Sequence, residues 1–328
     1  MAEPCIKRLT SGGIIVNYLC SSACGHCLYR SSPRRERGYM RPEALRPMLL
    51  KVADLGCSSM HIGGGEPLLD EDGLVAVLDV CRECGMGIDY VETNSSWYRD
   101  DESAMRTLER LLEHGGDTLL ISISPFHSEY IPFRKVRAVL ATCRATGMRT
   151  FPWTTEYVPE ISQLDEAKPH KLAEFKQHFG EDFLRTIPQR YSLNLNGRCL
   201  ETFRDELPGI PPQRILAETR RPCSEMWQSS HFHIDLHGNY VLTSCVGLAC
   251  RADDLGRPLA AQKYPWLNLL HNEGLAGLYQ RATDEYAFTP RPTYLNKCDL
   301  CQHIRQHLVI DRGISSPDLQ PVGFYREA

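Results

Sequence analysis

Three cysteines lie close together near the amino-terminal end of the chain. Cys20, Cys24 and Cys27 stand in the segment Cys-Ser-Ser-Ala-Cys-Gly-His-Cys, directly after a predicted strand. Thiolates are soft ligands that select iron–sulfur clusters or zinc, and a folded loop with this spacing can surround one metal centre. In a cubane cluster, three cysteines would leave the fourth iron without a protein ligand. The alternatives are a zinc site with His26 as fourth ligand, or buried thiols without a shared role.

A run of three glycines follows the next predicted strand. The segment His61-Ile-Gly-Gly-Gly-Glu-Pro67 places Gly64, Gly65 and Glu66 at the strand's carboxyl end. Glycines at such a position leave the backbone bare, so a ligand can approach it closely. Taken alone, the run is equally typical of a turn.

A second set of cysteines occupies the carboxyl-terminal third of the chain. Cys298-Asp-Leu-Cys301 has the spacing of half a metal site. Residues 233–245 read as a strand–turn–strand that turns at Leu-His-Gly-Asn, with Cys223 before it and Cys245 at its end. These four cysteines are predicted to hold one metal centre, either an iron–sulfur cluster or a structural zinc. Cys250 is an alternative to Cys245.

The other cysteines are interpreted as structural. Cys81 and Cys84 also form a Cys-x-x-Cys pair, but Cys81 falls on the apolar stripe of a predicted helix. Cysteine in such a position behaves as a small buried hydrophobic residue.

The elements that must position these groups alternate between strand and helix. Apolar residues recur with helical spacing in four segments that end near Gly56, Gly85, Gly115 and Gly147, a glycine being a common helix stop. Strand-like runs lie between and after them, at 13–19, 59–63, 88–93, 118–124, 150–158 and 191–196. This alternation predicts an α/β fold with a parallel sheet, as a partial (β/α)6 barrel or an open sheet. Functional groups then gather at the carboxyl ends of the strands.

The pattern changes after about residue 205. We expect a core domain over residues 1–206 and a small cysteine-rich α+β domain over residues 207–328. The net charge of −4, from 37 basic and 41 acidic residues, gives no field for nucleic acid. No apolar run is long enough to span a membrane, and no signal peptide is recognisable. These features predict a cytoplasmic protein whose thiols stay reduced.

The two amino-terminal motifs resemble those of the radical S-adenosylmethionine (SAM) superfamily. Its CxxxCxxC loop matches Cys20, Cys24 and Cys27, and its GGE motif matches Gly64, Gly65 and Glu66. The resemblance covers roughly residues 12–200 and favours the partial (β/α)6 barrel. His26 departs from the aromatic residue usual beside the last cysteine, although an imidazole can still pack as a flat ring.

The resemblance implies a [4Fe–4S] cluster whose unique iron chelates SAM. Reductive cleavage of SAM would give a 5′-deoxyadenosyl radical that removes a hydrogen atom from a substrate. The backbone from Gly64 to Glu66 would meet the SAM amino group, and the hydroxyls of Thr93 and Ser122 would also contact SAM. For both hydroxyls the alternative is a helix cap or a turn.

The carboxyl-terminal cysteines resemble the auxiliary-cluster extension of the same superfamily. The short twitch form fits better than the SPASM form, because His303 and His307 follow the CxxC where SPASM needs more cysteines. The implied cofactor is a second, fully ligated [4Fe–4S] cluster, held by Cys223, Cys245, Cys298 and Cys301. Four protein ligands favour electron transfer or a structural role over substrate binding.

Several side chains near the predicted barrel mouth are candidates to face the substrate. His127 is preferred, as a proton donor or acceptor; the alternative is that His127 and Glu129 only brace each other. Trp153, Glu156 and Arg198 are expected nearby.

The predicted function is a radical SAM enzyme acting on an unidentified small molecule. An electron donor such as flavodoxin or ferredoxin would serve it. The alternatives are a peptide-modifying enzyme and a non-catalytic iron–sulfur electron-transfer protein.

Overall fold

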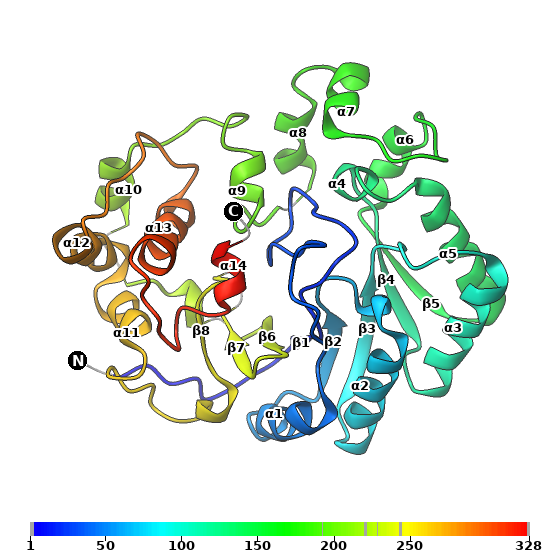
Figure 1. Ribbon diagram of the computed structural model, residues 1–328, viewed down its shortest axis with the longest axis horizontal. Helices are drawn as coiled ribbons and strands as arrows, with labels where there is room; N and C mark the ends of the chain where they lie inside the picture. Colours follow the sequence, from blue (N-terminus) through cyan, green and yellow to red (C-terminus); the bar gives the residue numbers. More distant parts are fainter. Residues whose placement is uncertain (1–2, 192, 220–221, 228, 243–244, 327–328) are drawn as a thin grey trace.

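One eight-stranded sheet runs through the protein (Figure 1). The computed structural model describes residues 3–191, 193–219, 222–227, 229–242 and 245–326, and in them the strands lie in the order β5-β4-β3-β2-β1-β6-β7-β8. The strands are β1 Gly12–Ile15, β2 Ser59–Gly63, β3 Gly87–Thr93, β4 Thr118–Ser122, β5 Arg149–Trp153, β6 Phe232–Asp235, β7 Asn239–Val241 and β8 Ala249–Arg251. Strands β1 to β5 pair in parallel, so the α/β class is confirmed.

Four long helices connect the parallel strands and cover the outer face of the sheet (Figure 1). They are α1 Pro42–Asp54, α2 Glu71–Glu83, α3 Asp101–Glu113 and α5 Phe133–Thr146. The predicted stripes lie mostly on their buried faces; in α1 these are Leu45, Met48, Leu49 and Val52, whereas Met105, expected in the stripe of α3, is exposed. The glycine after each helix has a positive φ, 102° at Gly56 and 68° at Gly85, as a helix stop requires.

The predicted strand over 191–196 is not formed in its described residues, and residue 192 lies outside them. The segment folds back locally, because the N–H of Leu193 donates to Tyr191 O at 2.8 Å and that of Asn196 to Asn194 O at 2.7 Å. These bonds replace a ladder with β5, which stays at the edge of the sheet. The chain reaches this segment through short helices instead.

A sixth parallel strand comes from the carboxyl-terminal part of the chain. Strand β6 pairs in parallel with β1, then turns at Gly238 (φ 76°) into antiparallel β7, so the predicted hairpin is confirmed. The sheet is therefore continuous across the expected boundary between residues 206 and 207, and the division into two domains stays a prediction. The carboxyl-terminal helices gather on the far side of the hairpin from α1, α2, α3 and α5 (Figure 1).

The remaining helices are mostly short. They are α4 Pro125–Ser128, α6 Val158–Ile161, α7 Leu172–Phe179, α8 Phe183–Arg190, α9 Cys199–Thr202, α10 Pro212–Glu218, α11 Pro265–Asn272, α12 Gly274–Tyr286, α13 Lys297–Gln306 and α14 Val322–Arg326. None of the helices in the described part of the chain has the length and apolar content of a membrane-spanning segment.

Candidate functional site

The loop after β1 brings its three cysteines together at the carboxyl end of the strand. Cys20 and Cys24 are buried and Cys27 is partly buried. Backbone N–H groups donate to two sulfurs, from Ser22 to Cys20 Sγ at 3.4 Å and from Ser31 to Cys27 Sγ at 3.3 Å. Burial, followed by the adjacent thiols of Cys20 and Cys27, raises the pKa of Cys24 well above its ordinary value. The predicted grouping of these cysteines is therefore present.

Side chains from the α9 region hold the loop by its carbonyl groups. Arg198 donates from Nη1 to Cys24 O and from Nη2 to Ser31 O, both at 3.0 Å, and Thr202 Oγ1 donates to Gly25 O at 2.7 Å. A Cβ on Gly25 would lie 2.6 Å from Thr202 Oγ1, so glycine permits this close packing. Arg198, expected near the substrate, instead fixes the shape of the cysteine loop.

His26 packs as a flat ring, as predicted. Its imidazole stacks on Phe126 with ring centroids 4.6 Å apart, and the ring of His127 meets it edge-on at 4.8 Å. Burial, then the neighbouring His127, lowers the pKa of His26 well below its ordinary value. The side chain therefore takes the place of an aromatic residue beside the last cysteine.

The glycine run lies against the cysteine loop. The N–H of Gly65 donates to Asn17 O at 2.9 Å, and that of Glu66 donates to Leu19 O at 3.0 Å. A Cβ would lie 1.9 Å from Leu19 O if placed on Gly65 and 2.7 Å from Asn17 O if placed on Gly64. The absence of side chains at Gly64 and Gly65 therefore lets the glycine run pack directly against the backbone of the cysteine loop.

The Glu66 side chain is fully buried and joins the end of β3 to the glycine run. It accepts hydrogen bonds from Thr93 Oγ1 at 3.0 Å, from the N–H of Asn94 at 2.7 Å and from the N–H of Leu68 at 3.2 Å. Burial raises the pKa of Glu66 to about 7, and these hydrogen bonds oppose that shift. Asn94 Nδ2 in turn donates to Cys20 Sγ at 3.4 Å. Glu66 therefore stabilises the residues that surround the cysteine loop through buried hydrogen bonds.

The two hydroxyls expected to contact SAM have different surroundings. Thr93 is buried; its oxygen donates to Glu66 and accepts from the N–H of Ser95 at 3.0 Å and from Trp97 Nε1 at 2.9 Å. Ser122, at the end of β4, is partly buried and borders the cavity described below. The Thr93 hydroxyl thus already makes its hydrogen bonds to protein groups.

His127 lies in the short helix α4, just beyond β4. Its Nδ1 is 2.7 Å from Ser124 Oγ, and burial lowers the pKa of the imidazole to about 4. Glu129 makes a different contact, accepting from the N–H of Leu172 at 3.3 Å. Ser124 and not Glu129 therefore braces His127.

One cavity of about 380 Å³ brings most of the predicted site residues together. Its lining includes the three loop cysteines, Gly64, Gly65, Thr93, Ser122, His127 and Trp153. It also includes Tyr90, Glu92, Phe151 and His231, which the sequence analysis did not single out. Alternation along the strands could have indicated Tyr90, Glu92 and Phe151, because side chains two residues apart in a strand point to the same face. Tyr90 and Glu92 have this spacing in β3, and Phe151 has it with Trp153 in β5.

The four predicted cysteines of the carboxyl-terminal part line a single cavity. They are Cys223, Cys245, Cys298 and Cys301. Burial, then the adjacent thiols of Cys298 and Cys223, raises the pKa of Cys245 well above its ordinary value. Two cationic side chains, Lys297 and Arg305, line the same cavity.

Cys250 and Cys81 lie apart from these groups. Cys250 is in β8, fully buried opposite Tyr240, and is not among the described residues that line the four-cysteine cavity. The alternative in which it replaces Cys245 therefore has no geometric support. Cys81 is buried in the apolar face of α2, as predicted.

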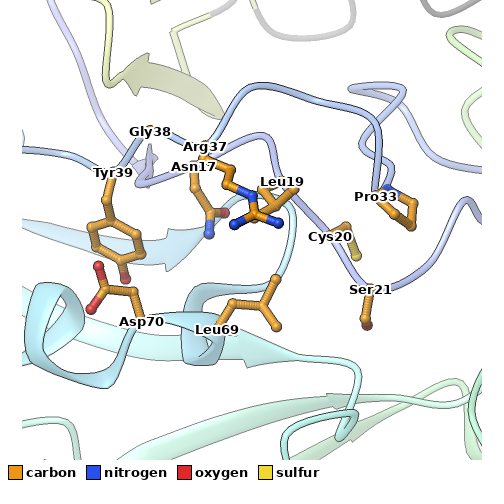
Figure 2. Close-up of a pocket in the computed structure, with 10 residues that line it drawn as sticks. All are labelled: Asn17, Leu19, Cys20, Ser21, Pro33, Arg37, Gly38, Tyr39, Leu69 and Asp70. Carbon is orange, nitrogen blue, oxygen red and sulfur yellow. The ribbon is translucent and has the colours of Figure 1, made fainter.

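A second hollow borders Cys20, between the cysteine loop and the start of α2 (Figure 2). Its walls include Tyr39 and Asp70, and the exposed Arg37 extends toward Leu19 (Figure 2). Tyr39 donates its hydroxyl proton to Pro67 O at 3.0 Å, which ties the loop to the residues after the glycine run.

Comparison with protein families identifies the domain. The family model described as "Radical SAM superfamily" matches residues 14–155, which contain the cysteine loop, the glycine run and most of the parallel sheet. Residues 14–155 therefore carry a radical SAM domain, as the motifs predicted. No curated protein matches the chain.

Solved structures resemble the chain at low sequence identity. A structure of anSMEcpe with bound AdoMet is 13% identical, covers 98% of this chain and 98% of that chain, and has a TM-score of 0.46. Streptococcus suis SuiB bound to S-adenosylmethionine is 15% identical over 83% of this chain and 67% of that chain, with a TM-score of 0.35.

Proposed function

We propose that the chain is a radical SAM enzyme that reductively cleaves SAM and removes a hydrogen atom from a small-molecule substrate. The observation that carries this proposal is that Cys20, Cys24, Cys27, Gly64 and Gly65 border one cavity within the part that matches the family model. When bound, the cluster and SAM would supply a 5′-deoxyadenosyl radical for that step.

The donor set of the cysteine loop fits a [4Fe–4S] cluster. Three thiolates would bind three irons and leave the fourth for another ligand. The N–H groups that donate to Cys20 and Cys27 would stabilise negative charge on the sulfurs. Arg198 holds the loop in shape through the carbonyl groups of Cys24 and Ser31.

The glycine run would meet the SAM amino group through its carbonyl oxygens. An ammonium group donates hydrogen bonds and needs acceptors. The N–H groups of Gly65 and Glu66 already donate to the cysteine loop. Of the two hydroxyls, Ser122 is the better SAM contact, because Thr93 already makes three hydrogen bonds to the protein.

The same cavity would hold the substrate beside SAM. Its volume of about 380 Å³ is in the range of small-molecule sites. His127 borders it, and its lowered pKa leaves the imidazole neutral at pH 7, able to accept or donate a proton. We assign His127 to the substrate side.

A peptide substrate is the second candidate. Strand β5 is at the sheet edge, and its Phe151 and Trp153 are 44% and 41% exposed at the cavity. An edge strand with exposed aromatic side chains can accept an extended chain.

The carboxyl-terminal cysteines would hold a second [4Fe–4S] cluster. Four thiolates complete its ligand set, which suits electron transfer or a structural role. Lys297 and Arg305 would offset the negative charge of a cluster bound to four thiolates. A structural zinc is the alternative for this site.

The cluster needs a reducing partner, which we propose to be flavodoxin or ferredoxin. The hollow in Figure 2 is a candidate approach, because it borders Cys20 and has the exposed Arg37 in its wall. We also propose a cytoplasmic location, because thiols that bind a cluster stay reduced there.

The test is SAM cleavage by the anaerobically reconstituted chain. We expect about eight irons per chain, four from each cubane, and formation of 5′-deoxyadenosine that requires a reductant. A chain that carries eight irons yet forms no deoxyadenosine above the enzyme-free control would instead be an electron-transfer protein. Zinc found in the carboxyl-terminal site would overturn the second cluster but not the proposal for the amino-terminal one.

A further inference from the structure

Three histidines meet on the inner face of the sheet, below the cysteine loop. His61 is in β2, His233 is in β6, and His231 immediately precedes β6. Strand β1 lies between the other two strands, and its Gly13 is paired with His61 on one side and with His233 on the other. The three residues His61, Gly13 and His233 therefore form one row across the sheet.

Gly13 makes the meeting of the two imidazoles possible. A Cβ at this position would lie 2.3 Å from His61 Nε2 and 2.7 Å from His233 Cδ2. Because glycine has no side chain, the two rings extend over β1 from both sides until their Nε2 atoms are 3.1 Å apart.

The ligand atoms of all three histidines lie within 4.8 Å of one another. With zinc–nitrogen bonds of about 2.0–2.1 Å, tetrahedral ligands stand roughly 3.3–3.4 Å apart. The His61–His233 distance of 3.1 Å is about 0.2–0.3 Å shorter than this, so a small separation of the two rings would fit the ion. His231 is exposed and borders the cavity, so a small rotation of its side chain would complete the set.

Neighbouring groups orient the rings as the surroundings of a metal site do. The Tyr29 hydroxyl is 2.8 Å from His233 Nδ1 and can accept its proton, which leaves Nε2 for a metal. His61 stacks between Tyr90, at 5.0 Å, and His231, at 5.2 Å. A carboxylate is also near, because Glu92 Oε1 is 3.8 Å from His61 Nε2.

We propose that His61, His231 and His233 bind a divalent transition-metal ion, with Glu92 available as a fourth ligand. Imidazole nitrogen suits zinc and ferrous iron, and a site that binds Fe²⁺ binds Zn²⁺ more tightly. His231 and Glu92 both border the cavity, so the ion faces the space in which we place the substrate.

Zinc is the probe for this site. The reconstituted, iron-loaded chain is equilibrated with Zn²⁺ and washed, and zinc is counted beside iron. We expect about one zinc per chain, with a zinc-edge X-ray absorption spectrum that shows nitrogen or oxygen ligands at roughly 2.0–2.1 Å and no sulfur. Sulfur ligands at roughly 2.3 Å would place the zinc in a cysteine site and overturn the proposal, as would the absence of bound zinc.

His231→Gln is the first variant, since the His231 side chain is exposed and lies just outside β6. It should weaken zinc binding at least tenfold with iron content unchanged. His237→Gln is the matched control; His237 follows the same strand and contacts Glu36 instead. Equal zinc affinity in the two variants would overturn the proposal.

Tyr29→Phe provides an independent test of the same site, because the Tyr29 hydroxyl contacts His233 rather than His231. Loss of the oxygen that orients His233 should weaken zinc binding roughly 10- to 100-fold. An unchanged affinity would show that Tyr29 does not orient a metal ligand and would overturn the proposal. These measurements do not use SAM cleavage, so they stand or fall apart from the proposed function.

Discussion

The two cysteine sites are assembled in opposite ways. Cys20, Cys24 and Cys27 come from one loop, and distant side chains such as Arg198 hold the loop by its backbone. The carboxyl-terminal cysteines come from three separate segments, which only the folded chain brings together. The first site borders a cavity of about 380 Å³, whereas the second lines a much smaller one of about 30 Å³.

This difference separates a reactive site from a supporting one. A local loop with three ligands can leave one iron open to a small molecule in the adjacent cavity. A site made of four ligands from distant segments is complete once the chain has folded, and it ties those segments together. The following changes test whether the two sites divide their roles in this way.

The largest effect is expected when the open site is removed. The triple variant Cys20→Ala, Cys24→Ala, Cys27→Ala should form no 5′-deoxyadenosine, because SAM loses its iron and its electron source. Its iron content should fall from about eight to about four per chain. Undiminished cleavage in this variant would overturn the assignment of the loop.

The second largest effect is expected at the carboxyl-terminal four-cysteine site. A matched pair of cysteine variants tests it. Cys245→Ala should lose about four irons, since the cluster proposed for this site is held by four thiolates and the variant would leave one iron without its ligand. Cys250→Ala, in the adjacent strand β8, should keep the full iron content, because Cys250 packs in the core opposite Tyr240. Iron analysis of both proteins checks this, and the reverse result would exchange the roles of the two residues.

The same contrast shows what the sequence could predict. The loop cysteines, the glycine run and the four helical stripes are local patterns, and they are present as expected except for Met105 in α3, which is exposed. The strand predicted over 191–196 fails because its residues satisfy their hydrogen bonds locally. Propensity alone does not reveal which partner a short extended segment will find.

The three-histidine group shows the opposite limit. His61 and His233 are 172 residues apart in the chain, and they meet only because β6 pairs with β1 rather than with the last strand of the core. Gly13, between them, gave no signal in the sequence that distinguished it from any strand glycine. A prediction of this group needs the strand order as well as the residue types.

A smaller effect is expected from the two hydroxyls near the open site. Ser122→Ala should weaken SAM binding roughly 5- to 150-fold, the equivalent of about 1–3 kcal/mol for a polar group left without a partner. Excess SAM should then partly restore cleavage. Thr93→Ala should instead lower the melting temperature, because Thr93 makes three hydrogen bonds, two of them buried. SAM titration and thermal unfolding of both variants check that Ser122 acts on SAM binding and Thr93 on stability. Equal SAM affinity in Ser122→Ala and the unmodified chain would exclude Ser122 as a contact.

The smallest effect on cleavage itself is expected at His127, although this residue tests the open site most sharply. His127→Ala should bind SAM normally and still form 5′-deoxyadenosine slowly without substrate, because the electron enters through the cluster and the imidazole contacts Ser124 rather than a cysteine. What the variant should lose is coupling, so that deoxyadenosine forms with little altered substrate.

His114→Ala serves as the control, since His114 ends α3 and pairs with Asp79 away from the cavity. The measurement counts deoxyadenosine and product in the same reaction once a substrate is known. Normal coupling in His127→Ala would overturn its assignment to the substrate side and mean that other polar groups of the cavity lining, such as Glu92, hold the substrate.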